Sequence, residues 1–179
     1  IYSVLKKFPE VNWMISFDNA DQQKFEYVRH GAEWERFVSN IAILKRDNQY
    51  VQAHPAYSIY CALELESYYQ FCHEHNLTDI FWCDLINPVA LDIRQHNDEL
   101  KNLAIEQIDK VLDKWPGKIT SNFDTLRSYK KHLQTAQYYP ELHRDSQETD
   151  LKKFSLAIEK KLKKSKTFAE LWPNIYKLL

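Results

Sequence analysis

The chain has 179 residues, of which 44% are hydrophobic and 14% aromatic, and its formal net charge is −1. These values are typical of a folded globular protein with a substantial core, and they exclude disordered and fibrous classes. The balance of 24 basic and 25 acidic residues gives no reason to expect nucleic acid as a partner. No apolar run approaches the length of a bilayer span and no signal-peptide pattern opens the chain, so no membrane is expected. An odd number of cysteines, three, fits a reducing cytoplasmic compartment.

Alternating side chains predict a first strand over residues 11–18. One face carries apolar side chains, and the other turns polar toward the carboxyl end: Val11, Trp13, Ile15 and Phe17 against Asn12, Met14, Ser16 and Asp18. Ligands of α/β sheets bind beyond the carboxyl ends of the strands, so Ser16 and Asp18 are candidate contacts. The alternative, which local evidence favours, is that Asp18, Asn19 and Asp21 form a turn and cap the next helix.

The pattern then alternates between helices and strands. Residues 32–47 carry apolar side chains at helical spacing, and residues 50–57 read as a second strand in which Pro55 indicates a bulge or an end. A helix over residues 65–72 and a third strand over residues 79–86 follow. This order predicts an α/β fold with parallel strands and right-handed crossovers.

Beyond Pro88 the pattern predicts helices only, which begin at about Leu100, Phe123, Leu151 and Leu171. We therefore predict a β/α part over residues 1–96 and a helical region over residues 97–179. Gly31 and Gly117 are the only glycines, so the chain has no glycine-rich loop to hold a phosphate.

Residues 16–41 carry a specific motif: Ser16-Phe17-Asp18, a short gap, FEYVRHGA over residues 25–32, then Trp34, Phe37 and Asn40-Ile41. It resembles the twitch-domain-containing radical SAM proteins, which read roughly S-(I/L)-D, a gap, then F-E-Y-I-R-H-G-A-x-W-x-x-F-x-x-N-(I/L). The resemblance continues more faintly through LINPVALDI at residues 85–93 and KTFAELWP at residues 166–173. It spans most of the chain, and its specific part is residues 11–41.

The resemblance implies a partial (β/α) barrel whose strand ends contact S-adenosylmethionine. Ser16 and Asp18 are then candidates for hydrogen bonds to the ribose or the methionine part. Arg29 is a candidate to pair with the cofactor carboxylate or with Asp18, and the favoured alternative is a structural ion pair with Glu26 or Glu33. Asn87 is a candidate to line the same end of the barrel, and the alternative is that it caps the turn before Pro88.

The chain lacks the Cys-x3-Cys-x2-Cys run that binds the [4Fe-4S] cluster of radical SAM enzymes. Cys61, Cys72 and Cys83 are spaced too widely for one loop, and the two histidines of His73-Glu74-His75 lie on opposite sides of a helix, so no metal site is predicted. The resemblance therefore places the cluster in an N-terminal remainder of the same protein, which is the expected partner.

Our leading hypothesis is the carboxyl-terminal portion of a radical SAM enzyme, inactive when isolated, with part of the cofactor pocket and the substrate wall. Neither a catalytic residue nor a substrate is identified by the sequence. The alternative is a non-catalytic α/β protein-interaction domain whose aromatic-rich helical tail binds another protein.

Overall fold

The computed structural model describes residues 2–5, 7–8, 10–85, 87–136 and 150–179. Its central feature is a sheet of four parallel strands in the order β1-β2-β4-β6. The strands are β1 (Trp13–Ile15), β2 (Val51–Ala53), β4 (Asp79–Ile80) and β6 (Thr120–Ser121). Two further strands, β3 (Ala56–Tyr57) and β5 (Cys83–Asp84), pair in parallel where the chain continues beyond β2 and β4. The predicted α/β fold with parallel strands is confirmed.

The predicted second and third strands each form in two parts. Pro55 separates β2 from β3, as its place in the sequence predicts, because proline has no N–H to donate to a ladder. The Cys83 N–H donates to the Pro55 carbonyl (3.0 Å), so pairing resumes directly after the break. The two short sheets therefore continue one another from β2 to β3 and from β4 to β5.

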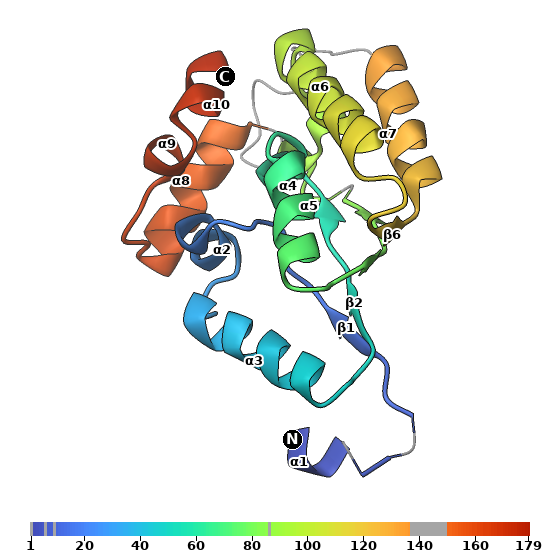
Figure 1. Ribbon diagram of the computed structural model, residues 1–179. Helices are drawn as coiled ribbons and strands as arrows, with labels where there is room; N and C mark the ends of the chain where they lie inside the picture. The colour runs from blue at the N-terminus through green and yellow to red at the C-terminus, as the bar shows by residue number, and fades with distance from the viewer. Residues whose placement is uncertain (1, 6, 9, 86, 137–149) are drawn as a thin grey trace.

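Helices make the connections between the strands (Figure 1). Figure 1 also shows α1 (Tyr2–Leu5) apart from the other helices, near the N-terminus. The connecting and following helices are α2 (Gln22–Val28), α3 (Trp34–Arg46), α4 (Ile59–Ala62), α5 (Leu65–Glu74), η1 (Val89–Leu91), η2 (Ile93–Gln95), α6 (Asp98–Lys114) and α7 (Phe123–Thr135). None of the helices in the described ranges is both long enough and apolar enough to cross a bilayer.

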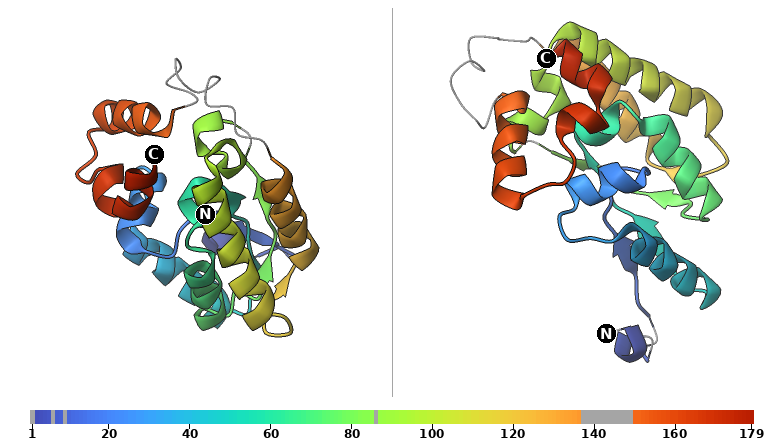
Figure 2. Two further views of the ribbon diagram at one scale, coloured as in Figure 1. Left: turned by 90° about the horizontal axis from the view of Figure 1, so that it is seen from above. Right: turned by 90° about the vertical axis from the view of Figure 1, so that its left-hand side faces the viewer.

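The last three helices pack beside α2, although they lie far from it in sequence (Figure 2). They are α8 (Leu151–Leu162), α9 (Phe168–Leu171) and α10 (Pro173–Leu178). The Tyr27 hydroxyl of α2 donates to Glu159 of α8 (2.9 Å), and the Tyr27 ring meets Trp172 edge-on with centroids 5.5 Å apart. The predicted helical C-terminal region is thus confirmed, and it is joined to the first crossover.

Strand β6 corrects the interpretation of residues 97–179 as helices only. Its two residues pair in parallel with β4, with Asp79 beside Thr120 and Ile80 beside Ser121. A strand of two polar residues has no apolar alternation, so the sequence gives no periodic signal for it. The sheet therefore extends past the predicted change at residue 96.

The core lies between the sheet and the helices that cover one of its faces. Phe17 is fully buried and stacks on Tyr68 of α5, with ring centroids 4.6 Å apart. Phe17 also contacts Phe37 of α3 and Phe71 of α5. The buried residues of the strands and of the segments directly after them are Phe17, Val51, Ala53, Tyr57, Ile80 and Trp82.

The opposite face of the sheet is exposed over much of its area. Met14 is 58% and Phe81 49% exposed. Strand register places Met14 beside Gln52 and Gln52 beside Asp79. We call this the open face, made by Met14, Gln52, His54, Asp79, Phe81 and Cys83. A parallel sheet in an α/β protein usually has both faces covered, so the open face is unusual.

Truncation of a phenylalanine should lower the free energy of unfolding by different amounts on the two faces of the sheet. Phe17→Ala should lower the free energy of unfolding by about 3–5 kcal/mol, because it leaves a cavity among packed rings. Phe81→Ala on the open face should change it by roughly 0.5 kcal/mol or less. Urea denaturation followed by circular dichroism measures both. A cost for Phe81→Ala that matches Phe17→Ala would show that the face is covered in solution.

Candidate functional site

The predicted site residues start directly after the carboxyl end of β1. We call this end, with Ser16, Phe17 and Asp18, the rim. Ser16 is exposed, Phe17 enters the core, and Asp18 is only 6% exposed. The predicted alternation is confirmed through Phe17. Asp18 is the exception, because it lies on the polar side of the pattern and is buried.

Asp18 is buried because its carboxylate takes part in strand pairing. The Ile15 carbonyl accepts the His54 N–H (2.8 Å), which is the last ladder bond from β1. The next donor, the Ala56 N–H of β3, reaches Asp18 Oδ1 instead (3.0 Å). The side chain thus replaces a backbone acceptor, and the partly buried Ala56 N–H is satisfied.

The second Asp18 oxygen binds Arg29, the residue that ends α2. Arg29 Nε and Nη2 lie 2.9 and 2.7 Å from Asp18 Oδ2. The Asp18 alternative for Arg29 is therefore confirmed, and the favoured pairing with Glu26 or Glu33 is wrong. Glu26 instead accepts the Trp34 N–H (3.0 Å) at the start of α3.

Asn19 and Asp21 form the predicted turn and cap. Asn19 Oδ1 accepts the Asp21 N–H (2.9 Å), and Asp21 Oδ1 accepts the Lys24 N–H (3.0 Å), which makes Asp21 the N-cap of α2. The capping alternative is thus confirmed for these two residues. Asp18 takes no part in the cap.

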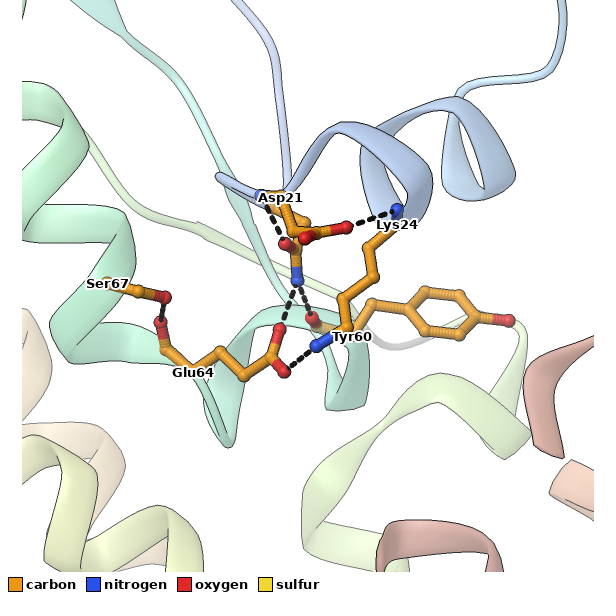
Figure 3. A network of polar contacts seen from close by, with 6 residues as sticks. Asp21, Lys24, Tyr60, Glu64 and Ser67 are labelled. Carbon is orange, nitrogen blue, oxygen red and sulfur yellow. Dashed lines mark hydrogen bonds and ion pairs between the residues drawn. The ribbon is translucent and has the colours of Figure 1, made fainter. Parts of the chain in front are cut away.

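Asn19 also connects the rim to α4 and α5. Figure 3 shows the network around its partners Asp21, Tyr60 and Glu64. The Asn19 amide donates to the Tyr60 carbonyl (2.9 Å) and to Glu64 Oε2 (2.6 Å), while Lys24 pairs with the other Glu64 oxygen. These partners are about forty residues from Asn19 and Lys24 in sequence. No local pattern predicts such a network.

A cavity of about 360 Å³ lies beside the rim, between the end of β1 and the start of α3. Ser16 and Arg29, two of the predicted residues, both line it, together with Glu33 before α3 and with Arg36 and Asn40 of α3. Arg36 is exposed and forms no ion pair with any residue that the structure describes. The sequence named neither Arg36 nor Asn40 as a site candidate: Asn40 is a position of the motif without an assigned role, and Arg36 has the pattern of an ordinary solvent-facing helical residue.

A second cavity of about 570 Å³ continues along the outer edge of β1. It shares Ser16, Arg36, Phe37 and Asn40 with the first. Its other lining residues are mostly apolar: Tyr2, Trp13, Ile15, Ile41, Ile43 and Leu44. A hydroxyl, an amide, two guanidinium groups and the Glu33 carboxylate beside an apolar groove suit a ligand with charged groups of both signs, hydroxyl groups and an apolar part.

Asn87 lies away from these cavities. It is exposed, it follows β5, and a cis peptide bond joins it to Pro88. A cluster of charged residues surrounds it in sequence: Arg94 binds Asp92 (2.8 Å) and lies 3.9 Å from Asp84. The structure therefore brings Ser16, Asp18 and Arg29 together and leaves Asn87 at the end of a different strand.

The described residues contain no group of three or more histidine, cysteine or acidic side chains arranged to hold a metal ion. Cys61 and Cys72 are buried, and burial raises the pKa of both thiols well above the ordinary value. Ligation needs the thiolate, so these cysteines do not fit a [4Fe-4S] cluster.

Comparisons with protein-family models, with curated proteins and with solved structures find no match for the chain. The family suggested by the motif of residues 16–41 therefore stays a prediction from the sequence.

The dual role of Asp18 predicts a stability cost when its charge is removed. Asp18→Asn keeps an acceptor for Ala56 and loses the ion pair, so it should lower the free energy of unfolding by about 2–4 kcal/mol. Asp124→Asn removes an exposed helical pair with Arg127 and should cost roughly 0.5 kcal/mol or less. Urea denaturation of the two variants makes the comparison, and equal costs would contradict the assigned role.

Proposed function

We propose that the chain is the carboxyl-terminal portion of a radical SAM enzyme and supplies part of the S-adenosylmethionine pocket and the wall of the substrate cavity. The observation that carries the proposal is that Ser16 and Arg29, placed by the motif, line one cavity at the carboxyl end of a parallel strand. Ligands of α/β folds bind at such ends. The resemblance implies the chemistry, and the position of the cavity supports the proposal.

The residues that line the cavity have different roles in this proposal. Asp18 occupies two nitrogens of Arg29, so Arg29 acts chiefly as a positioning residue that fixes the rim. Arg36 has no acidic partner in the described ranges and is the better candidate for the cofactor carboxylate. Ser16 and Asn40 offer a hydroxyl and an amide to the ribose hydroxyls. The apolar groove along β1 suits the uncharged parts of the ligand.

The cofactor provides the reaction, and this part of the protein provides its surroundings. In radical SAM enzymes, bound S-adenosylmethionine is the source of a 5′-deoxyadenosyl radical that abstracts a hydrogen atom from the substrate. Because Cys61 and Cys72 do not fit a cluster, the cluster ligands belong to another segment in this proposal. The residues of this chain bind, orient and shield the cofactor.

The open face gives the proposed N-terminal remainder a place to pack. Met14, Tyr50 and Phe81 expose apolar surface along one side of the sheet, and β1 and β6 are its edge strands. Edge strands leave backbone donors and acceptors available for further pairing. Strands that continue from β1 would cover this face and complete a partial barrel.

The same face also favours the alternative function. A non-catalytic interaction domain would cover Met14 and Phe81 with another protein and would have no use for Arg36 and Ser16. The two functions therefore differ in whether the rim cavity binds the cofactor.

A measurement of S-adenosylmethionine binding distinguishes the radical SAM function from the interaction domain. Equilibrium dialysis would use the protein made from the complete reading frame, with its cluster reconstituted. Ser16→Ala should weaken binding about tenfold, the equivalent of one hydrogen bond, and Arg36→Gln at least as much. Ser39→Ala, an exposed serine on α3 that lines neither rim cavity, is the matched control and should leave binding unchanged.

Two outcomes would contradict the proposal. One is wild-type protein that takes up a cluster and does not bind S-adenosylmethionine, which favours the interaction domain. The other is binding that neither Ser16→Ala nor Arg36→Gln weakens, which places the cofactor elsewhere.

A further inference from the structure

A cysteine and a histidine form a close pair on the open face. Cys83 Sγ lies 3.1 Å from His54 Nδ1. His54 follows β2, and Cys83 begins β5, so the two residues come from neighbouring strands. Backbone bonds fix the spacing, because the His54 N–H donates to Ile15 (2.8 Å) and the Cys83 N–H to Pro55 (3.0 Å).

The ring of His54 is held in place by Phe81. The two rings stack nearly parallel, with centroids 4.9 Å apart and planes 10° apart. Phe81 itself is largely exposed on the open face. The stack thus orients the imidazole toward the thiol at a surface that a molecule in solution can reach.

Cys83 differs from the other cysteines of the chain. Cys61 and Cys72 are 1% and 0% exposed, whereas Cys83 is only partly buried. Cys61 also donates to the Ala56 carbonyl (3.3 Å) inside the core. Cys83 is therefore the one thiol of the three that combines access with a basic partner.

The surroundings of Cys83 favour the protonated form of its thiol. Partial burial raises its pKa, and the charges of Asp84 on β5 and Asp18 after β1 raise it further. Each of these carboxylates also faces an arginine: Arg94 lies 3.9 Å from Asp84, and Arg29 binds Asp18. The thiolate is the nucleophilic form of cysteine, so reaction near neutral pH requires a base. His54 Nδ1 is placed to accept that proton.

We propose that Cys83 and His54 form a base-assisted nucleophilic site that reacts with small disulfides that reach the open face. The Cys83 proton passes to His54 Nδ1, and Cys83 Sγ bonds to one sulfur of the disulfide. The disulfide bond breaks, the second sulfur leaves as a thiolate, and that thiolate takes the proton from His54. One disulfide is exchanged for another, so no further oxidant or reductant is needed. The site does not require the proposed function; it requires that the open face be accessible, as it is in the chain alone.

The test follows release of the coloured thiol from 5,5′-dithiobis(2-nitrobenzoic acid), an aromatic disulfide, by the native chain. One equivalent should be released rapidly, and Cys83→Ser should abolish that phase because Cys61 and Cys72 are buried. His54→Gln should slow it about tenfold or more at pH 7. At alkaline pH, where the thiol ionises unaided, the His54→Gln and wild-type rates should converge.

His73→Gln, an exposed histidine on α5, is the matched control and should react like wild type. Circular dichroism checks that each variant folds. The proposal is overturned if His54→Gln reacts as fast as wild type at pH 7, or if the fast phase survives Cys83→Ser.

Discussion

Asp18 gives the Ala56 N–H an acceptor where β1 stops pairing, and with its other oxygen it binds the arginine that ends α2. The strands of this sheet are two or three residues long, so each contributes few ladder bonds. A side-chain acceptor at the rim therefore matters more here than in a long sheet. Since a buried carboxylate without partners is costly, Asp18 also constrains where Arg29 lies.

That constraint organises the cavity beside the rim. With Arg29 fixed against Asp18, the turn of residues 30–33 leads directly into α3, and Gly31 adopts a positive φ of 81° within it. Arg36 and Asn40 then follow on the α3 face that lines the cavity. The cavity is thus a consequence of how one strand end is satisfied. A ligand in it would rest on a rigid support, which is what binding sites require.

Local patterns predicted the parts of the molecule whose structure is set locally. Alternation placed Trp13, Ile15 and Phe17 on the covered face, and helical spacing located α3 and α6 closely. The same patterns failed where partners are distant in sequence. Arg29 reads as a helical residue beside Glu26, and only the fold shows that Asp18 is its partner. Strand β6 and the pairing of His54 with Cys83 likewise depend on strand register, which no single segment encodes.

Asp18 lies close to both proposed sites, the rim cavity and the thiol of Cys83. Asp18 accepts the Ala56 N–H, and the register places Ala56 beside Cys83, so the rim and the thiol are separated by one strand. The charge of Asp18 helps to raise the pKa of the Cys83 thiol. A bound group that changes the pairing of Asp18 with Arg29 would therefore also change the field at Cys83. Any cover that closes the open face must pack over His54 and Phe81, so a segment that completes the sheet also limits access to Cys83.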